Sequence, residues 1–142
     1  MQISNILAKK GGSVVTLKPD QTVREALALL VEKRIGALVV VDDAGKVVGL
    51  LSERDIIREA ARNEALFGEP VSRLMTTDVI VARPGDDLRA VENTMTVKRF
   101  RHLPIMDRGE LVGIVSIGDV VKAALDEYEG VIETLESRVE KG

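Results

Sequence analysis

The 142-residue chain contains no cysteine, a single histidine and only 2% aromatic residues. Without cysteine it has no disulfide, thiol nucleophile or thiolate metal site, and one histidine excludes a multi-histidine zinc or iron site within one chain. The three aromatic residues, Phe67, Phe100 and Tyr128, are too few to build a surface that stacks single-stranded bases. These absences exclude most classes of metalloenzyme and require an aliphatic core.

The chain also lacks a long apolar run and a strong excess of charge of either sign. No segment approaches the ~20 apolar residues of a membrane helix, and residues 1–5 do not begin a signal peptide, so we expect a cytoplasmic protein. The formal charge of -3 provides no global field for nucleic acid or an anionic membrane. Any bound anion must therefore be held by a local basic cluster.

An internal repeat is present instead. Residues 18–23 match residues 83–88 and residues 37–42 match residues 102–107, both at a spacing of 65, whereas residues 47–57 match residues 111–121 at a spacing of 64. The lost residue falls in a turn, as expected after duplication of a folded unit. We therefore expect two units, residues 1–70 with an N-terminal helix and residues 71–142 with a C-terminal helix.

Each unit begins with the pattern of a strand followed by a helix. Short β-branched runs at 14–16 and 79–81 end shortly before a proline, which is typical of edge strands. Apolar residues at helical spacing follow, and Thr22 and Asp87 are suited to cap these helices. The apolar positions in the first helix are Val23, Ala26, Leu27, Leu30 and Val31.

Two unbroken apolar runs come next in each unit, joined by a turn that contains Gly45 or Gly109. This pattern predicts a hairpin with strands covered on both faces. A second helix then begins at Ser52 or Ser116. Because a ~60-residue unit is marginally stable alone, we expect a mixed α+β fold in which two β-α-β-β-α repeats pack as one pseudo-two-fold module.

The two ends of the chain predict further helices. Ser4 is suited to cap an N-terminal helix that ends at Gly11 and Gly12. At the other end, apolar residues alternate at spacings of four and three, and this stripe packs either on its own domain or against a partner chain. Its members are Val121, Leu125, Tyr128, Ile132, Leu135 and Val139.

The most specific motif is Gly-x-x-Ser-x-x-Asp, which occurs at residues 49–55 and again at residues 113–119. A serine followed three residues later by a carboxylate at the start of a helix is close to a capping box. The start of a helix also favours phosphate, and a carboxylate in its first turn can accept both hydroxyl groups of a ribose. Both interpretations remain open on the sequence.

The motifs together resemble a tandem CBS-domain pair, the Bateman module, and most of all the small stand-alone CBS proteins. The resemblance rests on residues 35–40, 52–56 and 99–104 and covers nearly the whole chain. It implies clefts between the two units that bind AMP, ADP, ATP, S-adenosylmethionine or NAD(H), with no turnover, so that the protein is not an enzyme. It also implies a flat homodimer that regulates an unknown partner protein in trans.

The resemblance further implies roles for particular residues. Asp55 and Asp119 would hold the ribose hydroxyls, and Ser52 and Ser116 would bind ribose or phosphate. Backbone around the β-branched runs would surround the adenine, with two apolar residues in the wall of the pocket. These positions are Thr16, Thr77 and Val79 for the backbone, and Ile35 and Pro104 for the wall.

The phosphate contacts are expected to differ between the two clefts. His102 falls where some nucleotide-sensing relatives place a phosphate-binding histidine. Arg54 lies inside the first motif and Arg101 precedes His102, so each unit offers a cation at a different place. A guanidinium binds phosphate charge. Neutralising Arg101 should therefore weaken ATP binding more than adenosine binding.

Other functions fit the sequence less well. A triad of Ser116, His102 and Asp119 would support hydrolysis, but the chain has no Gly-x-Ser-x-Gly elbow. The basic cluster at residues 98–101 has no stacking aromatics for RNA, and the acidic pairs at 42–43 and 86–87 offer too few oxygens for calcium. The main alternative is a ligand-free module for dimerisation and protein docking.

Overall fold

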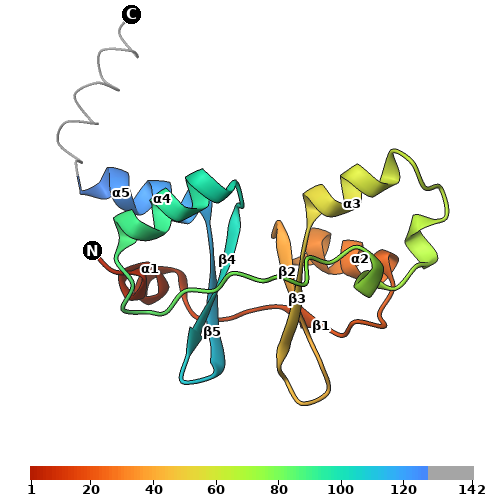
Figure 1. Ribbon diagram of the computed structural model, residues 1–142, viewed down its shortest axis with the longest axis horizontal. Helices are drawn as coiled ribbons and strands as arrows, with labels where there is room; N and C mark the ends of the chain where they lie inside the picture. The colour runs from red at the N-terminus through yellow and green to blue at the C-terminus, as the bar shows by residue number, and fades with distance from the viewer. Residues whose placement is uncertain (128–142) are drawn as a thin grey trace, which may run out of the picture.

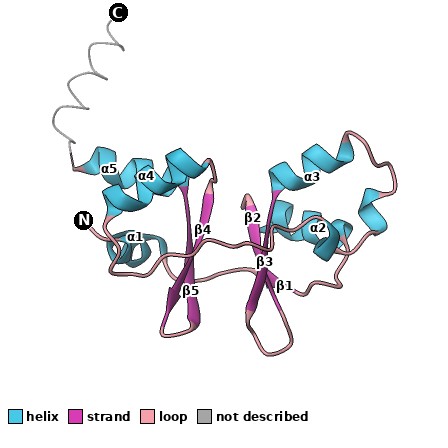
Figure 2. Ribbon diagram, viewed as in Figure 1, coloured by secondary structure: helices cyan, strands magenta, loops and turns pink. Residues whose placement is uncertain are grey.

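The computed structural model describes residues 1–127. Two similar halves stand next to each other, each made of a β-hairpin with helices on its outer side (Figures 1 and 2). The first half contains β1 (Thr16–Leu17), α2 (Val23–Lys33), β2 (Ala37–Val41), β3 (Val47–Ser52) and α3 (Glu53–Ala60). The second half contains α4 (Leu88–Lys98), β4 (His102–Asp107), β5 (Glu110–Ser116) and α5 (Ile117–Asp126). The expected mixed α+β fold built from two repeats is confirmed.

The first unit is organised around β2, whose five residues are all buried. This strand lies between β1, which pairs with it in parallel, and β3, which pairs with it antiparallel. Helix α2 covers the sheet and is capped as expected, because the Thr22 hydroxyl accepts a hydrogen bond from the amide of Glu25 at 3.2 Å. Val31, which was expected in the buried stripe of this helix, is 76% exposed.

The second unit lacks a continuous first strand. The run expected at residues 79–81 forms no strand, and the pairing is reduced to one bridge between Ala82 and Ile105. In the first unit the amide of Val39 donates to the carbonyl of Val15 at 3.4 Å. The residue equivalent to Val39 is Pro104, which has no amide hydrogen to donate. The ladder is therefore shorter in the second unit.

Helix α1 (Ile3–Lys10) belongs to the first unit in sequence but packs on the second. Ile3 is fully buried in the same cluster as Leu88 and Val115. A Cβ added to Gly113 of β5 would lie 2.5 Å from a Leu7 methyl group, so the glycine allows α1 to approach the strand closely. The interior of the second unit thus depends on a helix that precedes the first.

The start of α1 differs from the expectation. The helix begins after Gln2 and not after Ser4, because the Asn5 side chain accepts a hydrogen bond from the amide of Gln2 at 2.8 Å. It ends as expected at Gly11, which has a φ of +91°.

The connection between the units contributes to the first core. Two short 3-10 helices, η1 (Leu66–Gly68) and η2 (Val71–Arg73), carry Leu66 and Val71 into the cluster formed by α2, β2 and α3. Within residues 1–127, no helix is both long enough and apolar enough to cross a membrane. The expected apolar stripe continues beyond α5 at Tyr128, Ile132, Leu135 and Val139, which lie outside the described residues.

Candidate functional site

Both copies of the Ser-x-x-Asp motif form capping boxes at the start of a helix. At α3 the amide of Asp55 donates to the Ser52 hydroxyl at 3.3 Å, and Asp55 Oδ2 accepts from the amide of Ser52 at 2.9 Å. At α5 the corresponding distances are 3.1 and 2.8 Å for Ser116 and Asp119. The structural role suggested by the sequence is therefore present in both copies. Capping occupies only Oδ2 of each aspartate, so the second carboxylate oxygen, Oδ1, remains available in both copies.

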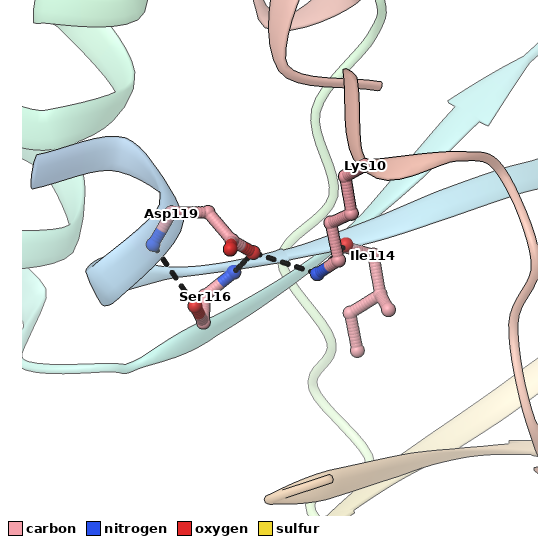
Figure 3. A network of polar contacts seen from close by, with 4 residues as sticks. All are labelled: Lys10, Ile114, Ser116 and Asp119. Atoms are coloured by element: carbon pink, nitrogen blue, oxygen red, sulfur yellow. Dashed lines mark hydrogen bonds and ion pairs between the residues drawn. The ribbon is translucent and has the colours of Figure 1, made fainter. Parts of the chain in front are cut away.

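The two carboxylates nevertheless have different surroundings. Asp55 receives hydrogen bonds only from the amide and hydroxyl of Ser52, both on Oδ2, and forms no ion pair within residues 1–127. Oδ1 of Asp55 thus has no hydrogen-bond partner in this part of the chain. The Asp119 carboxylate accepts a further hydrogen bond from the Lys10 ammonium group at 2.6 Å (Figure 3).

A cleft of about 640 Å³ separates the two units. Its walls come from the start of α3, residues 76–80 at the beginning of the second unit, the start of β4 and the start of α5. Of the expected site residues it brings together Ser52, Arg54, Asp55, Val79, Arg101, His102 and Ser116. These seven residues come from both repeats, so the cleft combines groups that lie far apart in the sequence.

The other expected site residues do not line this cleft. Thr16 is exposed on β1, and Pro104 is buried inside β4. Ile35 packs against the core of the first unit. Thr77 is exposed between two residues that do line the cleft. Asp119 lies in the wall of a separate hollow of about 180 Å³.

Four arginines give the cleft its charge. Arg54 and Arg58 come from α3, and Arg99 and Arg101 come from the segment that leads into β4. None of the four forms an ion pair within residues 1–127. Three carboxylates, those of Glu53, Asp55 and Asp78, also line the walls. The cleft is therefore a local basic site in a chain of formal charge -3.

Sequence reasoning missed several of the residues that line the cleft, among them Arg58 and Phe100. Arg58 follows Arg54 by four residues, which places both on one side of α3, and this spacing could have identified it. Phe100 is one of only three aromatic residues in the chain, and its ring contributes to the wall of the cleft as well as to the second core. Val79 and Ile80 also line the cleft.

His102 lies at the junction of the two units and is half-buried. A Cβ on Gly36 would lie 3.2 Å from its Nε2 atom, so the absence of a side chain at Gly36 makes room for the imidazole. Burial lowers the pKa of His102 from its ordinary value of 6.5. The negative charges of Glu53 and Asp119 raise this pKa and the positive charges of Lys10 and Arg101 lower it, with a net decrease.

The triad considered as a hydrolytic alternative is not formed. The Ser116 hydroxyl accepts from the amide of Asp119, and the Asp119 carboxylate binds Ser116 and Lys10. His102 pairs with Ser116 across the hairpin, but within the described residues neither group is hydrogen-bonded to it, so the proton relay of a triad is not assembled.

The Lys10 contact affects the titration of Asp119. Burial alone would raise the pKa of this carboxyl group, but the hydrogen bonds from Lys10 and Ser116, together with the Lys10 charge, outweigh burial. The pKa of Asp119 therefore lies below its ordinary value. The carboxylate is ionised and paired at neutral pH.

Comparison with known proteins identifies the class to which this fold and cleft belong. The family model of the CBS domain matches twice, at residues 4–62 and 71–126. The chain belongs to the CBS-domain family.

The related proteins include small CBS proteins and longer ones. The chain is 36% identical over 107 residues to the CBS domain-containing protein YhcV of Bacillus subtilis, covering 75% of this chain and 76% of YhcV. It is 37% identical over 110 residues to protein MJ1225 of Methanocaldococcus jannaschii, covering 78% of this chain but only 39% of that longer relative.

Solved structures of CBS proteins have the same architecture. The CBS-domain protein ATU1752 of Agrobacterium tumefaciens matches with a TM-score of 0.84 at 39% identity, covering 87% of this chain and 99% of that one. CBSX2 in complex with AMP matches with a TM-score of 0.73 at 33% identity, covering 89% and 98%. The CBS pair of protein MJ0100, in complex with 5'-methylthioadenosine and S-adenosyl-L-methionine, matches with a TM-score of 0.80 at 25% identity, covering 89% and 98%.

Proposed function

We propose that this protein is a regulatory module that binds a phosphorylated adenosine ligand in the cleft between its two units and acts in trans on a partner protein. The observation that carries the proposal is that one cleft combines an Asp55 carboxylate oxygen without a hydrogen-bond partner and four arginines without ion pairs, all judged within residues 1–127. The complexes of CBSX2 with AMP and of MJ0100 with S-adenosylmethionine support an adenosine-containing ligand.

The cleft suits such a ligand in size and in chemistry. Its volume of about 640 Å³ falls within the ~300–1,000 Å³ of small-molecule sites. Asp55 Oδ1 can accept a ribose hydroxyl while Oδ2 continues to cap α3. The guanidinium groups can receive phosphate oxygens, which they bind in pairs. Phe100, Val79 and Ile80 offer apolar surface for the adenine.

The ligand would regulate by holding the two units together. Arg54 and Arg58 belong to the first unit, whereas Arg99 and Arg101 belong to the second. A phosphate chain that binds both pairs favours one relative packing of the units over others. A partner protein that distinguishes these packings is then biased by the ligand, because a ligand shifts an equilibrium by its differential affinity for the two states.

Isothermal titration with adenosine, AMP, ADP, ATP, S-adenosylmethionine and NADH tests this proposal. The wild type should bind at least one adenine nucleotide, and Asp55→Asn should weaken that binding by at least ~10-fold, because a hydrogen bond to a charged group contributes ~1.5–3 kcal/mol. Asp20→Asn is the matched control, since Asp20 is an exposed carboxylate outside the cleft. An equal affinity for Asp55→Asn and wild type would contradict the assigned role.

A second candidate function, a ligand-free module for dimerisation and docking, is favoured by exposed apolar residues. Ile57 on α3 and Val121 on α5 are 67% and 40% exposed and occupy equivalent positions in the two repeats. Such pairs of apolar positions are suited to a symmetric interface. A folded dimer, demonstrated by light scattering, that releases no heat with any of the six compounds would support this candidate over the first.

A further inference from the structure

The Lys10 side chain forms an ion pair with the Asp119 carboxylate of the same chain. Its ammonium group lies 2.6 Å from Asp119 Oδ2 and donates a second hydrogen bond to the carbonyl oxygen of Ile114 at 2.8 Å. Figure 3 shows the lysine reaching from the end of α1 toward the start of α5, where Oδ2 also accepts from the amide of Ser116. This oxygen therefore has two donors, one of them charged.

The first repeat shows how the same place is built without the lysine. Leu50, the residue equivalent to Ile114, donates its amide hydrogen to the carbonyl of Thr76, and its own carbonyl accepts from the amide of Thr76, both at 2.9 Å. In the second repeat the Ile114 carbonyl accepts instead from the Lys10 side chain. Lys10 thus replaces a backbone donor at Ile114 and adds a cation at Asp119 that Asp55 does not have.

The lysine is held in place by a well-anchored helix. Ile3 and Ile6 of α1 are buried in the second core, and the amide of Ile3 donates to the carbonyl of Asp86 at 3.0 Å. Lys10 is the last residue of α1, and Gly11 turns the chain away immediately after it. The backbone that carries Lys10 is therefore held in place next to Asp119.

We propose that Lys10 acts as an internal cation that keeps the Asp119 site closed to adenosine ligands, so that each chain binds one ligand, at Asp55. This inference rests on the proposed function, because it assigns the binding to one of two equivalent carboxylates. A ribose hydroxyl is a neutral donor and forms a weaker hydrogen bond to a carboxylate than an ammonium group does. The Lys10 ammonium group stands beside the Asp119 carboxylate, so a ligand at either oxygen of Asp119 meets an ion-paired cation, whereas Asp55 has no ion pair within residues 1–127.

Binding stoichiometry tests the closed site. The probe is adenosine, which carries no phosphate and is not repelled by Asp119 when the lysine is removed. Wild type should bind one adenosine per chain, and Asp55→Asn should weaken this binding by at least ~10-fold. Lys10→Met keeps the aliphatic stem and should bind two, with the second site lost on adding Asp119→Asn. Lys33→Met is the matched control and should bind one, because Lys33 is exposed at the end of α2 and lines neither the cleft nor the hollow at Asp119.

Lys10→Arg keeps a cation at this place and should bind one adenosine, which guards against a general effect of substituting residue 10. Circular dichroism verifies that each variant is folded. Two equal sites in the wild type, or one site in folded Lys10→Met, would overturn the closed site but leave the proposed function intact. No binding of adenosine or any adenine nucleotide to the wild type and the folded variants would instead overturn the proposed function, and the inference with it.

Discussion

Arg101 provides a direct test of whether the cleft recognises phosphate. Its backbone position is fixed, because its carbonyl oxygen accepts a hydrogen bond from the amide of Ile117 at 2.8 Å. Its side chain is exposed in the cleft and forms no ion pair within the described residues. Arg101→Gln should therefore remove one positive charge from the cleft without disturbing the fold.

The size of the effect follows from the environment of this guanidinium. A pair of unit charges about 4 Å apart interacts by between ~1 kcal/mol in water and ~4 kcal/mol near a protein surface. Since the side chain is exposed, a value near the lower end, ~1.5 kcal/mol, is appropriate. This corresponds to roughly a tenfold loss of ATP affinity. Adenosine has no phosphate, so its affinity should change by less than about twofold.

Isothermal titration of ATP, AMP and adenosine into wild type and Arg101→Gln measures this difference. The control is Arg62→Gln, which removes the same charge from an exposed residue that pairs with Glu59 and lies outside the cleft. The loss should also shrink as salt is added, because screening weakens a solvent-exposed pair. Equal losses for ATP and adenosine would refute the electrostatic reasoning and make Arg101 a structural residue.

Three further predictions concern stability. Asp119→Ala should destabilise the protein by ~0.5–1 kcal/mol more than Asp55→Ala in urea unfolding. Both variants lose a capping acceptor, but only Asp119→Ala also loses the partly exposed ion pair with Lys10. Equal losses of stability would show that the pair contributes nothing. The pKa of His102 is lowered in the folded protein, so as pH falls the unfolded chain takes up this proton first, and the stability that neutral His102 contributes is present above its unfolded pKa of about 6.5 and is lost as pH falls toward its folded pKa. His102→Gln should therefore make the free energy of unfolding depend less on pH between about pH 7 and 5. An unchanged slope would contradict this. Gly12→Ala should lower the free energy of unfolding by ~1–3 kcal/mol, because its Cβ would lie 2.7 Å from the backbone oxygen of Val112. Gly68→Ala, which has open space around the added Cβ, should change it by no more than ~0.5 kcal/mol when both variants are unfolded by heat.

The features that the sequence predicted well are those decided by a few neighbouring residues. Thr22, Asp87, Ser52 and Ser116 each cap a helix because the accepting side chain and the amide that it binds are three residues apart. The hairpins follow from apolar runs that flank a turn. The strand expected at 79–81 does not form, and the proline at residue 104, in the strand it would have joined, removes one of the hydrogen bonds that the first unit has.

The features that could not be predicted are contacts between distant segments. The sequence predicted a helix before the first unit, but helical periodicity contains no information about which unit such a helix covers. The contact between Lys10 and Asp119 joins residues 109 apart in the sequence. Nothing near either residue indicates the other, and the resemblance to CBS pairs implied equivalent roles for Asp55 and Asp119.

The two repeats differ most where a ligand would bind, and the differences all favour the cleft at Asp55. Gly118 stands in α5 where α3 has Arg54, so the second motif lacks a guanidinium in its first turn. The second unit instead contributes Arg99 and Arg101 to the cleft at Asp55. A cleft whose cations came from one unit would bind phosphate equally well at any relative position of the two units. Because these cations come from both, phosphate binding depends on the distance between the units, and that dependence is what a regulatory ligand requires.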